Sequence, residues 1–290
     1  MVAGMPPGGG ADVSGRKLAA QLGRVLKQNI VVENIAGAAG NSAAVTVAGG
    51  NPDGHTIFFS SHPVFAVNPI LYEKLPFNPN DFQPVVQVSQ ASHVLLANLV
   101  LPATRVSDLI TLARSKPRGI NFASSGVGSS PHLCGELFNT AAGVDMVHVP
   151  YKGAGVATTD ILSGQIQMFC SGLTALNALI KAGRMRPIGM ATLKRSSLMP
   201  DIPTINEQGL KDFEVTSWTG IVAPAKTPRA IVQKLYDALA RITQTDDMKQ
   251  FVQQQGADMA LLGPEAFAAE IKNDIAKWGK LVKAAKIAPE

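Results

Sequence analysis

One stretch of the sequence, residues 119–150, decides the fold class; it reads GINFASSGVGSSPHLCGELFNTAAGVDMVHVP. A short apolar run (119–125) leads through glycines and serines into the apolar spacing of a helix (129–143), and a second apolar run (146–150) follows. A strand, a helix and a strand in this order form a βαβ unit with parallel strands. Since the alternation recurs along the chain, we predict an α/β protein whose sheets are mostly parallel and flanked by helices.

Short apolar runs alternate with amphipathic stretches in the rest of the chain as well. The first helix is predicted from the apolar spacing within residues 13–26, with Asp12 or Ser14 as its N-cap. Further strands are predicted at 29–34, 56–61 and 166–170, and further helices near 41–49, 228–243, 246–255 and 264–285, with two more beginning near Gly155 and Thr174.

Two Pro-bearing segments have the character of crossings between lobes. They read NLVLPATRV (98–106) and TSWTGIVAPAKTP (216–228), with β-type runs beside small residues. If both are crossings, residues 1–100 and 222–290 form one discontinuous lobe, and residues 101–221 form the other. Two lobes joined by two strands form a hinged clamp.

Composition excludes several classes of protein. The chain has 290 residues, of which 46% are apolar, so it can bury a large core. Its 26 basic and 21 acidic residues are spread out, and no basic block with interleaved aromatic residues suggests nucleic-acid binding. No apolar run approaches the about 20 residues that cross a bilayer. No targeting segment is visible before the prolines, so we expect that none exists or that it was removed.

The first glycine-rich loop suggests an anion site. Residues 6–15 read PPGGGADVSG, and the glycines stand just before a predicted helix N-terminus, where exposed N–H groups and the helix dipole favour a carboxylate or a phosphate. The spacing approaches the phosphate-binding G-x-x-x-x-G-K-[ST], but Arg16 stands in place of the lysine and Lys17 in place of the hydroxyl. The G-x-G-x-x-G spacing is not matched either. A plain strand-to-helix turn remains the alternative.

Five predicted strand ends are rich in small polar residues. They read PPGGGAD, NIAGAAGN, SSHP, ASSGVGSSPH and CSGLT. In sheets of this kind, ligands gather at the carboxyl ends of the strands, where loops and helix N-termini converge. The loops therefore favour a ligand-binding cleft.

Seven segments resemble one known family, the Bug-type solute receptors of tripartite tricarboxylate transporters. The similarity covers nearly the whole chain in the same order. The segments are PPGGGAD, VVENIAGAAGN, PDGHTIFF, NPILYEKLPFNPNDFQPV, GVDMVHVPYKG, RSSLMPDIPTINEQG and AKWGKLVKAAKI.

This resemblance implies a type II-like periplasmic-binding-protein fold, with two α/β lobes and two crossover strands as a hinge. It implies a non-catalytic periplasmic receptor that captures a small carboxylate between the lobes and delivers it to membrane transporter subunits. In such proteins the loops corresponding to residues 6–12 and 37–41 hold a ligand carboxyl group, largely through main-chain groups and waters. Members carry a secretory signal, so this chain is expected to be a mature or trimmed form.

The sequence departs from the family pattern at three places. Ala39 stands in GAAG where glycine is usual, and the first strand is short. Cys170 stands where many members carry Asp, which could pair with the ammonium group of an amino acid. A neutral thiol cannot, so we expect a carboxylate without an amino group, either an aliphatic dicarboxylate or an aromatic acid.

The candidate ligand-binding residues come from the five loops. His62 and His132 are possible donors to a carboxylate, although His132 is equally suited to brace its loop through a main-chain bond. The full set is Pro7, Gly8, Gly9, Gly10, Asp12, Gly37, Ala38, Ala39, Gly40, Ser60, Ser61, His62, Ser125, Gly126, Ser129, Ser130, His132, Cys170 and Ser171.

Other side chains receive structural interpretations. Lys152 is interpreted as a charge at the rim that steers anions. Trp218 either packs near the hinge or covers the ligand. Three histidines within or beside strands are expected to pack, and the two cysteines are expected to be small buried residues, with a disulfide possible but unsupported by their spacing. The histidines are His55, His93 and His148, and the cysteines are Cys134 and Cys170.

Two alternatives to a transport receptor stay open. An enzyme acting on carboxylates needs a nucleophile with a base, or a metal set, and neither occurs at a persuasive spacing; G-x-S-x-G occurs nowhere. A sensor that feeds a signalling partner shares every cleft residue. We expect no enzyme activity, no cofactor, no metal, no nucleic acid and a monomer.

Overall fold

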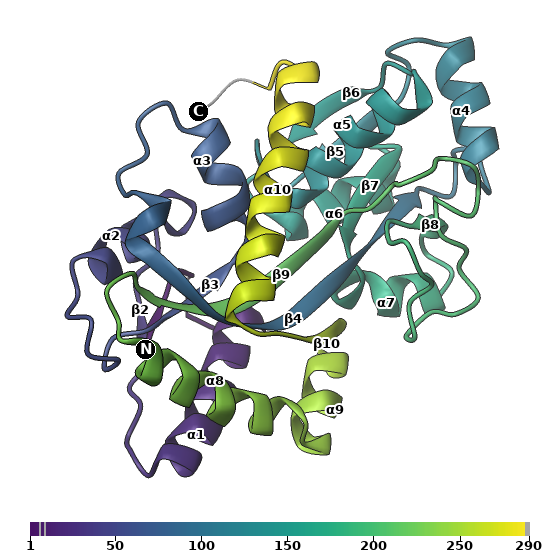
Figure 1. Ribbon diagram of the computed structural model, residues 1–290. Coiled ribbons are helices and arrows are strands. Elements are labelled where there is room, and N and C mark those ends of the chain that lie inside the picture. Colours follow the sequence, from purple (N-terminus) through teal and green to yellow (C-terminus); the bar gives the residue numbers. More distant parts are fainter. Residues whose placement is uncertain (6, 9, 288–290) are drawn as a thin grey trace. The chain divides into compact units, whose positions relative to one another are not determined.

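The computed structural model describes residues 1–5, 7–8 and 10–287 (Figure 1). The chain forms two compact units. Unit 1 comprises Met1–Gln90 and Trp218–Gly279, and unit 2 comprises Ala91–Ser217 with the end of the chain from Lys280. The lobe limits expected from the sequence, at residues 100 and 222, stay a prediction about which segments move together.

Three elements pass from one unit to the other along the chain. They are β4 (Phe82–Ala97), β9 (Thr216–Pro224) and α10 (Pro264–Ala284). The sequence analysis placed His93 within or beside a strand but gave no bounds for β4, because a run of consecutive buried apolar residues masks the alternating pattern. The chain therefore passes from unit 1 to unit 2 within strand β4 and returns within strand β9.

Unit 1 is a small sheet with helices. Strand β1 lies between β2 and β3 and is parallel to both, with Val2 opposite Glu33 and Phe58, and β3 is antiparallel to β9. Figure 1 shows α1 alongside α8, which contacts it. The elements confined to this unit are β1 (Val2–Ala3), α1 (Gly10–Leu26), β2 (Glu33–Asn34), α2 (Asn41–Ala48), β3 (Phe58–Ser61), α3 (Asn68–Leu71), α8 (Arg229–Thr243), α9 (Asp246–Gln254), β10 (Ala257–Leu262) and the short turns η1 (Ala38–Gly40), η2 (Pro63–Val67) and η3 (Pro79–Asp81).

Unit 2 contains the stretch that decided the fold class. Strand β5 lies between β6 and β7 and is parallel to both, and β4 runs antiparallel to β7 and β8. The elements confined to this unit are α4 (Val106–Ser115), β5 (Asn121–Ser124), α5 (Ser130–Ala142), β6 (Val147–Pro150), α6 (Ala154–Ser163), β7 (Met168–Gly172), α7 (Leu173–Lys181) and β8 (Arg186–Met190). The α/β prediction is confirmed.

Two local predictions near the N-terminus are wrong in extent. The first helix begins at Gly10, so Asp12 and Ser14 lie within it and neither caps it. The strand predicted at 29–34 shrinks to Glu33–Asn34. The reason is that its parallel partner, β1, is itself only two residues long and offers a short ladder.

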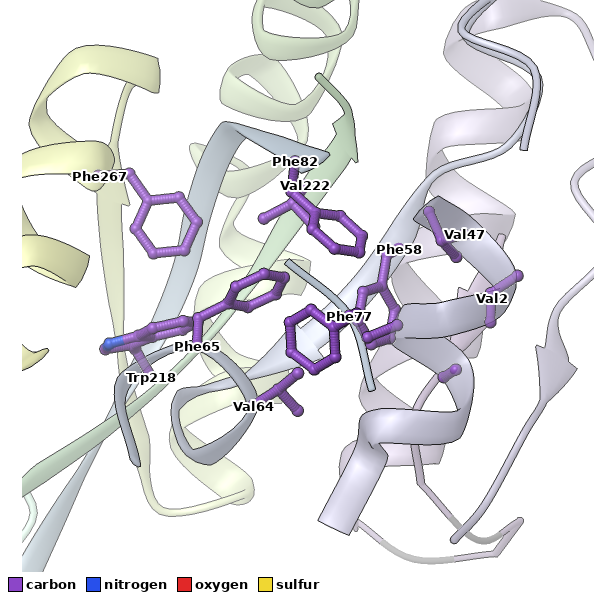
Figure 2. Close-up of a cluster of buried hydrophobic side chains, with 12 residues drawn as sticks. Val2, Val47, Phe58, Val64, Phe65, Phe77, Phe82, Trp218, Val222 and Phe267 are labelled. Carbon is purple, nitrogen blue, oxygen red and sulfur yellow. The ribbon is translucent and has the colours of Figure 1, made fainter. Parts of the chain in front are cut away.

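The core of unit 1 is dominated by aromatic side chains (Figure 2). The Phe65 ring meets the Phe82 ring edge-on at 5.1 Å, and the Trp218 ring meets the Phe267 ring edge-on at 4.9 Å. Such edge-to-face contacts are favourable because the positive ring edge meets the negative face. Trp218 is 2% exposed, so within unit 1 it packs in the core.

Candidate functional site

The predicted site residues fall into two groups, one in each unit. In unit 1, Asp12 organises the first glycine-rich loop. Its Oδ2 accepts the Gly8 N–H at 2.9 Å, and its Oδ1 accepts Asn34 Nδ2–H at 2.8 Å. Arg16 lies one helical turn later and its Nε donates to the same carboxylate at 3.1 Å. Gly9 lies outside the described residues.

The Asp12 carboxylate therefore serves the loop itself. The Gly8 amide, together with Asn34 and Arg16, lowers the pKa of Asp12 to about 2, so the group is ionised at neutral pH. Asn34 Nδ2 also donates to Met5 O at 3.1 Å, which ties the loop to the end of the β2 strand. Asp12 is 3% exposed. Asn34 and Arg16 are positioning residues that the sequence reading missed, although the i,i+4 spacing of Asp12 and Arg16 was a signal for one of them.

The second loop, residues 37–40, has a backbone that favours glycine. Gly37 and Gly40 have φ values of 127° and 92°, and between them Ala39 has φ 53° and ψ 32°. A Cβ atom on Gly40 would lie 2.7 Å from Val64 Cγ2, so only glycine fits there. Ala39, by contrast, holds a left-handed conformation that costs an L-residue about 1–2 kcal/mol.

Two asparagines support this loop from the neighbouring helices. Asn68 Nδ2 donates to Ala39 O at 3.2 Å and to Asn41 Oδ1 at 2.6 Å. Asn41 is 1% exposed, and its Nδ2 has no partner among the described residues. The loop backbone is thereby held by side chains that the sequence reading did not single out.

His62 is enclosed between two tryptophans. Its Nε2 accepts the Trp278 Nε1–H at 2.9 Å, and its ring meets those of Trp218 and Trp278 edge-on. Because an indole N–H can only donate, Nε2 is the acceptor of this bond, and the buried Nδ1 has no partner among the described residues. Asp274 Oδ2 accepts the Trp218 Nε1–H at 2.8 Å and lies 3.4 Å from His62 Nε2. His62 is 1% exposed and packs in unit 1, and its Nε2 is already occupied by the hydrogen bond from Trp278.

In unit 2, the loop between β5 and α5 is held by hydroxyl and imidazole groups. Ser129 Oγ donates to Gly126 O at 2.7 Å, and Ser124 Oγ accepts the Gly126 N–H at 3.1 Å. The Gly128 N–H donates to His132 Nδ1 at 3.1 Å. His132 thus makes the main-chain bond that was one of its two predicted roles. Ser125 in this loop and Ser130, the first residue of α5, are partly exposed.

His132 and His148 form a stacked pair behind this loop. Their ring centroids are 3.7 Å apart with an interplanar angle of 14°, and Phe122 continues the stack against His148 at 5.1 Å. Burial, together with the charge of its neighbour, lowers the pKa of His132 to about 3, and burial lowers the pKa of His148 to about 4. Both imidazoles are neutral at pH 7, so His132 Nδ1 is available as an acceptor.

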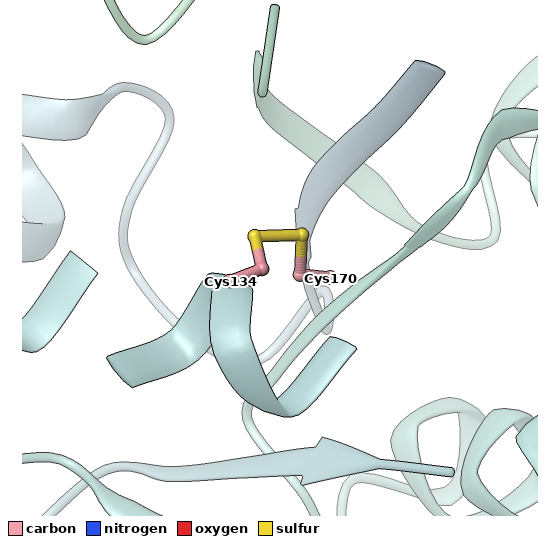
Figure 3. Close-up of a disulfide and its surroundings, with 2 residues drawn as sticks. All are labelled: Cys134 and Cys170. Carbon is pink, nitrogen blue, oxygen red and sulfur yellow. A yellow bond between two sulfur atoms is a disulfide. The ribbon is translucent and has the colours of Figure 1, made fainter. Parts of the chain in front are cut away.

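The two cysteines form a disulfide, which corrects the expectation of two separate buried thiols (Figure 3). Cys134 lies in the first turns of α5 and Cys170 lies in β7, with Cα atoms 6.1 Å apart. Spacing in the sequence did not indicate the pair, because β7 comes beside β5 only through the parallel pairing of the sheet. Ser171 follows directly in β7 and is 5% exposed.

The remaining predictions divide between surface and interior. Lys152 is exposed, as a rim charge requires. His93 is buried at 4% exposure and His148 is partly buried, but His55 is exposed, so the prediction that it packs is wrong. Its turn lies ahead of β3 rather than in it. The buried Ser60 hydroxyl has no partner among the described residues.

The described part of the chain holds neither a metal-binding cluster nor a membrane-spanning helix. Within residues 1–5, 7–8 and 10–287, no group of three His, Cys, Asp or Glu side chains is placed to hold a metal ion. No helix over the same residues has the length and hydropathy of a membrane span.

Comparisons with known proteins identify relatives over the full length. The family model described as "Tripartite tricarboxylate transporter family receptor" matches residues 15–287. The R. palustris protein Rpa4515, solved with adipate, is 34% identical, with a TM-score of 0.86 over 100% of this chain and 97% of that one. The periplasmic binding protein BugD is 31% identical, with a TM-score of 0.82 over 100% and 98%. MatC from Rhodopseudomonas palustris, solved with bound malate, is 30% identical, with a TM-score of 0.80 over 97% of both chains.

Proposed function

Because this chain belongs to the tripartite tricarboxylate transporter receptor family, we propose that it captures a small carboxylate in the periplasm and delivers it to the membrane subunits of such a transporter. The family consists of binding proteins, and the chain is a receptor and not an enzyme. The α/β periplasmic-binding-protein fold agrees with this assignment.

The proposed ligand is a carboxylate without an amino group, either an aliphatic dicarboxylate or an aromatic acid. The observation that carries this proposal is the full-length similarity to the Rpa4515 protein solved with adipate, which MatC with malate supports. Neither of those ligands has an ammonium group. In this chain the Cys170 sulfur is bonded to Cys134, so the residue offers no negative charge to an ammonium group.

The proposed site uses the loops before α1 and α5 as seats for carboxylate groups. Both loops end at a helix N-terminus, where amide N–H groups and the helix dipole attract an anion. The Asp12 and Asn34 network holds the first loop, and Ser125 in the second loop and Ser130 at the start of α5 are partly exposed. We further propose that residues 1–100 with 222–290 and residues 101–221 are the two lobes that move as separate bodies when the ligand binds.

A periplasmic location is supported by the disulfide as well as by the relatives. Disulfides form and persist in oxidising compartments and are rare in the cytosol. The bond between Cys134 and Cys170 therefore favours an exported protein over a cytosolic one.

A thermal-shift screen tests the proposed function. The protein is unfolded in denaturant and refolded to remove any bound ligand, then mixed with adipate, malate, succinate, benzoate and nicotinate, with aspartate and glutamate as amino-acid controls. A ligand at a hundredfold over its dissociation constant adds about 2.7 kcal/mol to the apparent stability, which raises the melting temperature measurably. We expect a shift with one or more of the acids that lack an amino group. No shift with any carboxylate, or a larger shift with aspartate or glutamate, would contradict the proposal.

A further inference from the structure

We propose that the stacked imidazoles of His132 and His148 are the positioning element of the segment 124–132, which contains the loop between β5 and α5, and that binding affinity depends on the hydrogen bonds that one nitrogen of each ring makes to this segment. The inference rests on the proposed function, in which this loop contacts the ligand. It assigns to two histidines a role distinct from direct contact with the carboxylate.

The first nitrogen is His132 Nδ1. It accepts the Gly128 N–H at 3.1 Å, and a backbone N–H can only donate, so the ring must be neutral with its proton on Nε2. Gly128 has φ +75° and is buried, so no water replaces the imidazole as its partner without rearrangement of the turn. His132 thus fixes the middle of the loop.

The second nitrogen is His148 Nε2. It shares a hydrogen bond of 2.6 Å with Ser124 Oγ, and the same hydroxyl accepts the Gly126 N–H. Ser124 is fully buried at the end of β5. His148 on β6 therefore fixes the beginning of the loop through Ser124, across the parallel pairing of β5 with β6.

The stacking contact couples the positions of the two imidazole rings. The two rings are 3.7 Å apart, so neither can tilt without moving the other, and Phe122 closes the stack on the side of β5. Gly135 lets the helix approach Phe122, because a Cβ atom there would lie 2.2 Å from Phe122 Cε2. The loop is consequently held from β5, β6 and α5 at once.

The amide side chains of Asn and Gln provide a matched test. An Asn oxygen takes the place of the acceptor Nδ1 of His132, and the terminal amide of Gln, which can donate or accept, takes the place of Nε2 of His148. His132→Asn and His148→Gln therefore keep the hydrogen bond, whereas His132→Phe and His148→Phe keep a stacking ring and lose it. His132→Gln and His148→Asn place the amide at the wrong position and serve as controls.

Three measurements are made on each variant. Calorimetric titration with adipate and malate gives the affinity, urea unfolding gives the stability, and amide spectra by NMR report Gly126 and Gly128. We expect both Phe variants to lose about tenfold in affinity, the equivalent of one hydrogen bond, and to shift the amide of the glycine concerned. The position-matched Asn and Gln variants should stay within about threefold of the unmodified protein.

The outcomes separate this inference from the proposed function. Equal losses of affinity in the Phe variant and the position-matched variant would show that the rings only pack, and unchanged affinity in the Phe variants would also overturn the inference. If the unmodified protein binds no carboxylate, the proposed function fails, and the glycine amides decide the inference instead. A Gly128 amide that shifts in His132→Phe and returns in His132→Asn supports it, and one that does not shift overturns it.

Discussion

Reduction of the bond between Cys134 and Cys170 should destabilise unit 2 more than any single surface substitution. The two cysteines are separated by 36 residues, and the bond joins α5 to β7 inside that unit. A cross-link removes conformational freedom from the unfolded chain, and this loss of entropy grows with the logarithm of the number of residues in the closed loop. For a loop of this length the relation gives about 4 kcal/mol at 25 °C.

This magnitude is a large share of the about 5–15 kcal/mol by which folded domains are stable. With a urea dependence of about 3 kcal/mol per molar, the unfolding midpoint should fall by roughly 1 M. Because both cysteines lie in unit 2, a transition with two steps should show the fall only in the step that belongs to unit 2.

Urea unfolding followed by circular dichroism, with and without dithiothreitol, measures the effect. The reduced chain keeps both sulfur atoms, so the comparison is free of the cavity that a substitution leaves. Cys134→Ala combined with Cys170→Ala is the control, and its midpoint should be low and insensitive to reductant. A reduced protein with the midpoint of the oxidised one would refute the reasoning.

Three further predictions concern single positions. The pKa of His132 is lowered from 6.5 to about 3 in the folded state, so the unfolded chain takes up the proton first as the pH falls and the free energy of unfolding decreases below about pH 6.5. His132→Asn lacks this group, so on going from pH 7 to pH 5 it should lose about 2 kcal/mol less unfolding free energy than the unmodified protein. Gly135→Ala should lower the unfolding free energy by about 1–3 kcal/mol because the new methyl group clashes with Phe122. Gly155→Ala, in α6 with no atom near the new methyl group, should leave the unfolding free energy unchanged or raise it, and equal effects of the two variants in urea unfolding would contradict this packing. Ala39→Gly should raise the unfolding free energy by about 0.5–1 kcal/mol because it relieves the left-handed strain, and a decrease would contradict the assigned φ.

The sequence predicted those parts of the fold that depend on local patterns. The βαβ unit around α5, and helices α8 and α10, follow from apolar periodicity, and the structure gives them close to the predicted limits. The extent of strand β4 was missed because different partners pair with its two halves, with β7 and β8 pairing only along the second half. Pairing between distant segments leaves no local signal.

The candidate site shows the same division. Glycines and serines indicated the two loops, because backbone freedom and helix capping depend on residues that are adjacent in the sequence. The residues that hold those loops are distant in sequence: Asn34 reaches Asp12 across 22 residues, and His148 reaches Ser124 across 24. Neither contact is visible before the strands are paired, and the same is true of the disulfide.

The measurement that tests the central claim most directly is calorimetric titration of the ligand-stripped protein with adipate, beside hexane-1,6-diol, which has the same chain length without charge. The claim is that the chain is a carboxylate receptor. It predicts saturable binding of adipate, or of another dicarboxylate or aromatic acid from the screen, at one site per chain, with weakening at high salt and no binding of the diol. Equal binding of adipate and the diol, or no heat with any of the acids, would contradict it.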